Sequence, residues 1–294
     1  MNSTQPIIIH DCQYYDSVAY NNKLSTVDFN FGLFHSNIRS IQKNFDDFKY
    51  YVETLNNRFS VIGLSETWTY NNDDNAHLYA MKGYSGIFSS RSGKGGGGVC
   101  VFIDSNFIYK VRHDLSDSID ENIFESNFIE LSCTNGPNIV VGNIYRPPGN
   151  DILSFQNALE GITTKINREN KLCYLMGDFN INLLHYDQHQ ATGNFLDNLV
   201  SDSFESLIDM PTRVSDHSAT LIDLSFTNST HELCPGILLT DMSDHFSVFV
   251  LANHSKQKQT NMNSNIRKID AKNILSHGKV FIVSQILMLR ITNS

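Results

Sequence analysis

The chain has 294 residues, of which 40% are hydrophobic and 18% charged. This balance is typical of globular proteins and provides enough apolar side chains for a sizeable core. The formal net charge is −9, and residues 253–294 hold seven Lys and Arg against one acid, so residues 1–252 carry −15. That excess of acid argues against the broad basic surface by which many proteins bind duplex DNA tightly. Five scattered cysteines without a CxxC pair argue against a zinc knuckle or a disulfide framework.

No stretch of the sequence resembles a membrane anchor or a secretion signal. Residues 1–11 contain only three consecutive isoleucines and no basic region before them. Phe281–Leu289 is apolar but shorter than the roughly 20 residues that a bilayer span needs. We therefore expect an intracellular protein without a signal peptide or a transmembrane segment.

The chain opens with an irregular segment and then a strand–helix–strand unit. Residues 1–27 are polar and show no period, which predicts a flexible N-terminal arm. Phe29–Phe34 and Val61–Leu64 have the composition of strands. Between them, Ser40–Asn57 is predicted to be a helix because apolar side chains recur every three or four positions, and Ser40 is a suitable N-cap.

Strands dominate the middle of the chain. Short apolar runs alternate there with turn residues, which is the pattern of antiparallel hairpins. The predicted strands are Tyr84–Ser89, Val99–Ile103, Phe107–Arg112, Asn127–Ser132 and Ile139–Tyr145. The glycine run Gly95–Gly98 lacks the Lys-Ser/Thr of a phosphate-binding loop, so we interpret it as a flexible turn.

A second helix-containing unit completes the pattern. The predicted helices are Asp151–Asn167 and Asn194–Val200, and the predicted strands are Leu172–Met176, Thr220–Phe226 and Ser247–Leu251. Strands outnumber helices, and the helices fall in two separate places. We therefore predict a four-layered α/β sandwich, in which two mainly antiparallel sheets pack face to face with helices outside.

Composition divides the chain into three parts. We predict one domain over residues 28–252, preceded by the arm at residues 1–27. Residues 253–294 are rich in Asn, Ser, Lys and Gln, which predicts a linker-like tail, truncated from something longer.

The tetrapeptide Gly177-Asp178-Phe179-Asn180 is the most informative motif. It follows a buried strand, and Gly177 relaxes the backbone where that strand ends. Asp178 and Asn180 are two residues apart, so on extended backbone both side chains leave the same face. A carboxylate can hold a hard cation or orient water, and an amide can donate to a phosphate oxygen.

Further polar residues follow other predicted strands. They are Asn37, Glu66, Tyr145 and the triplet Ser243-Asp244-His245. Asp223 lies inside the apolar run Leu221–Phe226, and a buried carboxylate needs a cation, a histidine or a metal as partner. Each of these residues alone is an ordinary cap or turn residue, but the ordered set indicates one active site.

This ordered set resembles the endonuclease/exonuclease/phosphatase superfamily, which has a DNase I-like fold and includes apurinic endonucleases and inositol polyphosphate phosphatases. Several short sequence segments are most similar to the endonuclease domain of non-LTR retrotransposons. In those elements this domain precedes a reverse transcriptase. The segments that carry the likeness are Asn37-Ile38-Arg39-Ser40, Leu64-Ser65-Glu66-Thr67-Trp68, Gly95–Gly98, Tyr145-Arg146-Pro147-Pro148, Pro211-Thr212-Arg213 and Thr220-Leu221-Ile222-Asp223. The likeness spans roughly residues 30–252.

The resemblance implies a metal-dependent phosphodiester hydrolase. Glu66 would hold Mg²⁺, with Mn²⁺ as a possible substitute. Asn37 would support that metal or the phosphate, and Asp244 would add a metal contact. Asp178 would orient the attacking water, and Asn180 would donate to a phosphoryl oxygen.

The resemblance also implies roles for residues around the reacting phosphate. His245 would contact it or transfer a proton, with its ring fixed by Asp223. Tyr145 would lie near it as a hydrogen-bond donor or a partly ionised phenol. Arg146 and Trp68 would bind substrate, although Trp68 could equally be a core aromatic.

The implied activity is that of a DNA endonuclease that nicks target DNA for retrotransposition, acting in the nucleus as a monomer without a stable protein partner. Arg39 stands where apurinic endonucleases carry an acid, so abasic-site repair is not implied. Two alternatives remain open: a phosphatase or phospholipase-like member of the same fold, and a catalytically inert remnant of a retrotransposon. A second Asp-His pair, Asp216-His217, is interpreted as a loop.

Overall fold

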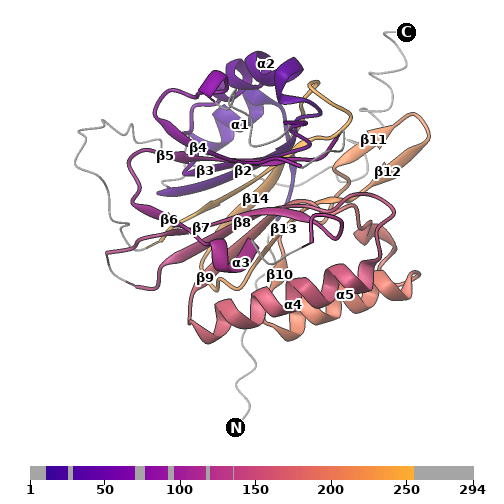
Figure 1. Ribbon diagram of the computed structural model, residues 1–294. Coiled ribbons are helices and arrows are strands. Elements are labelled where there is room, and N and C mark those ends of the chain that lie inside the picture. The colour runs from indigo at the N-terminus through magenta and orange to yellow at the C-terminus, as the bar shows by residue number, and fades with distance from the viewer. Residues whose placement is uncertain are drawn as a thin grey trace.

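The computed structural model describes residues 11–25, 29–69, 77–91, 96–116, 120–134 and 136–254. They form an α/β sandwich in which two sheets lie face to face in the middle, with helices covering both outer faces (Figure 1). The predicted fold class is confirmed. Within the described ranges, no helix combines the length and the apolar character that crossing a bilayer requires.

The first sheet has seven strands and carries α1 (Ser17–Leu24) and α2 (Ile41–Thr54) on its outer face (Figure 1). Its pairs are antiparallel except β2–β3 and β1–β14. In spatial order the strands are β1 (Tyr14–Tyr15), β14 (Leu233–Leu238), β15 (Ser247–Ala252), β2 (Phe31–Asn37), β3 (Val61–Ser65), β5 (Val99–Asp104) and β4 (Tyr84–Ser89).

The second sheet has six strands and lies against α4 (Ile152–Arg168) and α5 (Gln190–Ser201). Here β8 and β9 form the parallel pair. In spatial order the strands are β10 (Glu205–Ser206), β13 (Asp223–Thr227), β9 (Leu172–Asp178), β8 (Ile139–Tyr145), β7 (Glu125–Leu131) and β6 (Tyr109–Val111). The short elements α3 (His113–Ser116) and the 3₁₀ turn η2 (Leu183–His185) connect these strands, and β11 (Arg213–Ser215) and β12 (Ser218–Thr220) form a separate hairpin.

The core has three layers, because alternate residues of each strand face opposite sides. Leu33 of β2 and Val141 of β8 lie in the layer between the sheets, whereas Phe34 lies in the layer under α2. Phe155 of α4 belongs to the third layer, beneath α4 and α5. The helices α2, α4 and α5 each bury one apolar stripe, as the periodicity of the sequence predicts.

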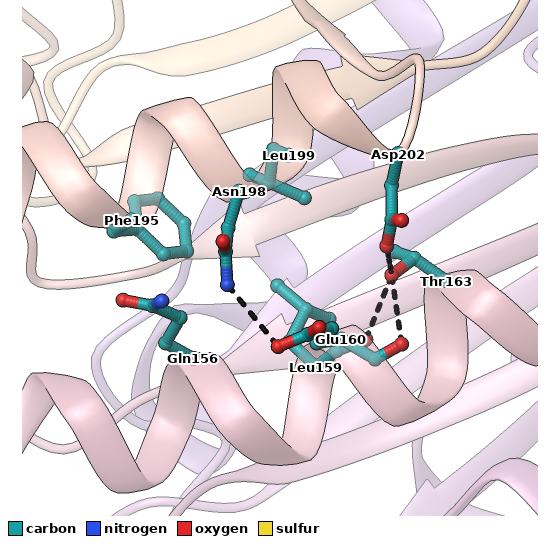
Figure 2. A pocket seen from close by; sticks show the side chains of 8 residues that line it. All are labelled: Gln156, Leu159, Glu160, Thr163, Phe195, Asn198, Leu199 and Asp202. Carbon is teal, nitrogen blue, oxygen red and sulfur yellow. Dashed lines mark hydrogen bonds between the residues drawn. The ribbon is translucent and has the colours of Figure 1, made fainter.

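The seam between α4 and α5 is polar at its surface. Figure 2 shows Thr163 donating a hydrogen bond to Asp202, and Asn198 donating to Glu160 with an N–O distance of 3.2 Å. The hollow there is only about 10 Å³, which holds one water molecule at most. The two hydrogen bonds fasten α4 to α5, and the hollow between them is too small for a substrate.

Two predicted boundaries need correction. Residues 11–25 are not a loose arm: β1 adds to the edge of the first sheet, and α1 begins at an N-cap, where Asp16 accepts from the Ala19 N–H at 2.7 Å. At the other end the fold extends past residue 252, since the His254 ring bonds the Tyr174 hydroxyl at 2.8 Å. Residues 1–10 and 255–294 lie outside the described residues.

The strand β14 was absent from the sequence prediction. Its Pro235-Gly236 pair has the composition of a turn. In the structure Gly236 pairs with Phe249 of β15, and a Cβ on Gly236 would lie 2.5 Å from the Phe249 ring. Position 236 requires glycine because the Phe249 ring leaves no room for a Cβ, and not because the chain turns there.

Candidate active site

The polar residues at the strand ends meet at one end of the sandwich. On the second sheet, four of them occupy neighbouring positions on β7, β8, β9 and β13: Glu125 pairs with Tyr145, Tyr145 with Asp178, and Asp178 with Asp223. On the first sheet, Asn37 ends β2 beside Ser65 of β3. We call the four positions Glu125, Tyr145, Asp178 and Asp223 the strand-end row.

Asp178 is held by backbone and side-chain donors from both sheets. Asn37 Nδ2 donates to its Oδ2 at 2.9 Å, and the backbone N–H of Asn180 donates to its Oδ1 at 3.1 Å. Gly177 allows the close approach of the strands, because a Cβ there would lie 1.8 Å from the Ile144 carbonyl oxygen. Burial and then the negative charge of Asp223 raise the pKa of Asp178 well above its ordinary value.

Asp223 and His245 form the buried pair that the sequence led us to expect. His245 Nδ1 lies 2.9 and 3.1 Å from the two Asp223 oxygens, and both side chains are almost fully buried. Burial alone lowers the pKa of His245, but the charge and hydrogen bond of Asp223, with the charges of Asp178 and Asp244, outweigh it and raise the pKa to about 9. The imidazole is therefore protonated at neutral pH, with Nε2–H as its remaining donor.

Glu66 is oriented by two aromatic donors. The Tyr145 hydroxyl donates to Oε1 at 2.9 Å, and the indole Nε1 of Trp68 donates to Oε2 at 3.1 Å. Burial and then the charge of Glu66 raise the pKa of Tyr145, so it serves as a neutral donor, not as an ionised phenol. Trp68 is 42% exposed, which places it at the rim of the site and excludes the core alternative.

These contacts join the predicted residues into one chain across the site. Glu66 bonds Tyr145, whose strand neighbour Asp178 bonds Asn37 and pairs with Asp223, which bonds His245. Five non-glycine residues around it have positive φ: Arg39, Ser40, Glu66, Trp68 and Asn180. Such strained backbone is concentrated at functional sites, where the surrounding structure has to enforce it.

The family model described as "Endonuclease/Exonuclease/phosphatase family" matches residues 28–245. The chain belongs to this family. A search of curated proteins finds no match to the sequence.

Solved structures of family members show the same fold. An AP endonuclease from Leishmania major aligns with a TM-score of 0.61 at 15% identity, covering 76% of this chain and 88% of that one. The endonuclease domain of TRAS1, a telomere-specific non-LTR retrotransposon, aligns with 0.56 at 12% identity, covering 76% and 98%. A 3′ phosphatase, NExo from Neisseria, bound to a product DNA hairpin, aligns with 0.55 at 14% identity, covering 76% and 100%. At these identities the likeness concerns the fold alone.

Arg146, for which the resemblance implies substrate binding, is directed toward the backbone of neighbouring loops. Its side chain is buried, and its guanidinium donates to backbone carbonyls of Phe179, Asn180 and Asn150. In return, Asn180 Nδ2 donates to the Arg146 carbonyl at 2.8 Å, leaving one amide hydrogen of Asn180 for a ligand. Arg146 therefore fixes the loop that carries Asp178 and Asn180.

Asp244 is not positioned with the metal ligands that the sequence suggested. Its Oδ1 lies 2.9 Å from Arg39 Nη1, and its Oδ2 lies 2.7 Å from Arg213 Nε. The hydrogen bond from Arg213 and the surrounding positive charges outweigh burial and lower the pKa of Asp244. The second Asp-His pair, Asp216-His217, is exposed at the turn of the β11–β12 hairpin, as predicted.

Sequence reasoning missed a support behind Glu66. Glu125 Oε2 accepts from the Gly98 N–H, and its Oε1 bonds Arg91 at 2.6 Å. The Gly98 and Gly97 carbonyls accept from the N–H groups of Thr67 and Trp68 at 3.2 and 2.8 Å. The glycines thus hold the segment after Glu66 in place. The only sequence signal was a glutamate at the start of an apolar strand.

A second set of polar residues, beneath the strand-end row, was also missed. Asn127, Asn143 and Ser225 lie two residues further along β7, β8 and β13, on the same face, with Met176 at the corresponding position of β9. Asn143 reaches the other sheet and donates to the carbonyls of Leu64 and Cys100 at 2.9 and 3.1 Å. Polar residues within apolar strands are the signal that could have found this second set.

The donor set fits a hard divalent cation. Among the described residues, polar atoms of Asp178, Asp223 and His245 lie within 4.8 Å of one another, and the Glu66 carboxylate accepts from the Tyr145 hydroxyl. Because the protonated His245 ring has no free lone pair, the oxygen donors available to a cation are the carboxylates. Carboxylate oxygens are what Mg²⁺ and Mn²⁺ prefer. Three carboxylates against one imidazolium also leave the site negative, so a phosphodiester would be repelled unless a cation offsets that charge.

Proposed function

We propose that the protein is a Mg²⁺-dependent DNA endonuclease that nicks a target duplex and exposes a 3′ hydroxyl for priming, as in non-LTR retrotransposons. The observation that carries this proposal is the continuous set of contacts from Glu66 through Tyr145, Asp178 and Asp223 to His245. Every residue that we propose to be catalytic is present, which argues against an inert remnant.

The reaction is an in-line attack of water on the phosphorus of a phosphodiester. Asp178 accepts a proton from the attacking water, since its raised pKa makes it a stronger base than an ordinary carboxylate. The bond from phosphorus to the 3′ oxygen breaks, leaving a 5′ phosphate, and the 3′ oxygen takes up a proton from solvent water to become the 3′ hydroxyl. The proton that Asp178 accepted is released to solvent. The Nε2–H of protonated His245 and the free amide hydrogen of Asn180 donate to phosphoryl oxygens.

Glu66 would hold the cation, and Asp178 is left to orient the attacking water. When bound, the cation neutralises charge on the phosphoryl oxygens. Tyr145 and Trp68 orient Glu66 toward it by fixing both carboxylate oxygens. Asn37 positions Asp178, because its amide donates to Asp178 Oδ2.

DNA is favoured over an inositol phosphate by two features. The sequence segments around Asn37 and Tyr145 resemble retrotransposon endonucleases, and Trp68 offers an exposed aromatic face at the rim on which a base can stack. Cleavage of chromosomal DNA would place the protein in the nucleus, where we expect it to act as a monomer.

The proposal is tested by nicking of supercoiled plasmid in Mg²⁺, run beside hydrolysis of an inositol polyphosphate. We expect the parent protein to nick the plasmid, and Asp178→Asn and His245→Ala to lower the rate by at least about 100-fold. Asp46→Asn, which changes an exposed carboxylate on α2, is the matched control and should nick at the parent rate. Folded parent protein that fails to nick, or that prefers the inositol phosphate, would contradict the proposal.

A further inference from the structure

Two exposed arginines share one carboxylate beside the active site. Arg39 Nη1 and Arg213 Nε lie 2.9 and 2.7 Å from opposite oxygens of Asp244, and the arginine side chains are 43% and 41% exposed. Each ion pair uses one edge of a guanidinium, which has five N–H donors. Both arginines therefore keep donors that face solvent.

This cluster adjoins the proposed catalytic residues on two sides. The Arg39 backbone N–H donates to Asn37 Oδ1 at 3.2 Å, and Asn37 in turn bonds Asp178. Arg213 forms an isolated backbone bridge with His245. The arginines are thus tied to both halves of the site, one from the end of β2 and the other from the start of the β11–β12 hairpin.

The charge of the cluster contrasts with that of the chain. Residues 1–252 carry −15, so general attraction to a polyanion is absent. Two guanidiniums with one carboxylate leave a local excess of one positive charge, and planar guanidinium forks match the geometry of phosphate oxygens. The Asp244 carboxylate keeps the guanidinium groups of both arginines in fixed positions when no ligand is present.

We propose that Arg39 and Arg213, held apart by Asp244, bind a backbone phosphate of the nucleic acid next to the one that is cleaved. This inference rests on the proposed function and deepens it, because it names what distinguishes the substrate. A polynucleotide has a neighbouring phosphate to offer and a lone phosphodiester has none, so the cluster selects chains over small phosphate esters.

Binding without catalysis gives the first test. A fluorescently labelled DNA duplex is titrated with full-length protein in EDTA, at several salt concentrations. Arg39→Gln and Arg213→Gln should each weaken binding roughly three- to tenfold and reduce the slope of log K against log [salt] by about 1, as the loss of one phosphate contact does. Arg39→Lys and Arg213→Lys keep the charge and should retain most of the slope.

Lys110→Gln is the matched control. It removes the same charge from an exposed side chain on the edge strand β6, where Lys110 pairs with Glu130. We expect an unchanged salt slope for this variant. An equal fall in all three glutamine variants, or an unchanged slope in Arg39→Gln and Arg213→Gln, overturns the proposal.

Hydrolysis of a thymidine dinucleotide, which has a single phosphate, gives the second test. Arg39→Gln and Arg213→Gln should keep the parental kcat/KM on the dinucleotide and lose it on a longer oligonucleotide. Equal losses on both substrates overturn the inference. A parent that binds DNA with the expected slopes but cleaves neither substrate contradicts the proposed endonuclease and leaves the phosphate contact supported.

Discussion

At the scale of single residues, the site depends on charges that are buried together. Asp178, Asp223 and His245 are each almost fully shielded from solvent, so each one shifts the protonation of the others. The mechanism requires Asp178 to be ionised and His245 to be protonated. Because burial and Asp223 raise the pKa of Asp178, and Asp223 raises that of His245 to about 9, the required pair of states prevails between the two values.

This arrangement predicts a bell-shaped pH profile of kcat for nicking. The rate should rise as Asp178 loses its proton and fall near pH 9 as His245 loses its own. Asp223→Asn removes a negative charge that raises both pKa values, so both limbs should move to lower pH, in addition to a loss of rate. Limbs that stay in place in Asp223→Asn would contradict these assignments.

Several residue-scale contacts could be predicted from the sequence and others could not. A carboxylate inside the apolar run that holds Asp223 needs a cation, a histidine or a metal, and the family resemblance implied that the partner is His245. Nothing local distinguishes Arg146, which turns inward, from Arg213, which stays exposed. The direction of each depends on whether backbone carbonyls of a distant loop lie within reach, as they do for Arg146 at Phe179 and Asn180.

At the scale of elements, the segment after β3 is held from two sides. The N–H groups of Ser40 and Ile41 donate to the carbonyls of Glu66 and Thr67 at 2.8 and 2.9 Å, extending the β2–β3 pairing beyond the strands. From the other side, Gly98 accepts from the Thr67 N–H. The segment that presents Glu66 is therefore fixed although Glu66 itself has a φ of +53°.

The substitution Gly98→Ala should disturb the position of Glu66. The substitution Gly96→Ala, two residues earlier in the same glycine turn, should not. Both glycines have positive φ, so each substitution strains the backbone by about 1 kcal/mol. A Cβ at Gly98 would also lie 2.3 Å from Thr67 Oγ1, whereas a Cβ at Gly96 meets nothing within 4 Å. We expect Gly98→Ala to raise the Mg²⁺ concentration needed for half-maximal nicking several-fold.

Trp68 gives a readout of this change that does not depend on activity. It is the single tryptophan of the chain, and its indole donates to Glu66. The fluorescence of Gly98→Ala should differ from that of the parent, and the fluorescence of Gly96→Ala should match it. Identical spectra and identical Mg²⁺ dependence in both variants would show that the glycine turn does not position Glu66.

At the scale of the whole molecule, the two sheets enclose a polar layer next to the site. His35 of β2 is fully buried there, and neither ring nitrogen has a hydrogen-bond partner among the described residues. Burial lowers the pKa of His35 to about 4, with a smaller opposing effect from Asp223. The folded protein therefore holds this imidazole neutral, whereas the unfolded chain protonates it near pH 6.5.

His35 should make folding stability depend on pH in a defined window. A pKa lowered by folding means that the unfolded state binds more protons, so the stability contributed by neutral His35 is present above pH 6.5 and lost as pH falls toward 4. His35→Leu should reduce the pH dependence of the unfolding free energy in this window by roughly 1.4 kcal/mol per pH unit. Urea unfolding at a series of pH values measures the difference, and equal slopes for both proteins would contradict it.

The sequence by itself determined the alternation of strands and helices, because apolar periodicity reports which face of each segment is buried. It also identified polar side chains that meet at one end of the sandwich: Asp178, Glu66 and His245 are reactive types placed at strand ends, and the resemblance that they support agrees with the family of the chain.

Only the tertiary structure decided the orientation and the contact partners of the side chains around the site. It turned Arg146 inward, tied Asp244 to two arginines and set the glycine turn behind Glu66. These outcomes depend on the packing of two sheets whose strands are far apart in sequence, and on the burial that this packing imposes. A local pattern contains neither distance nor dielectric environment, and both set the protonation and the partners of a side chain.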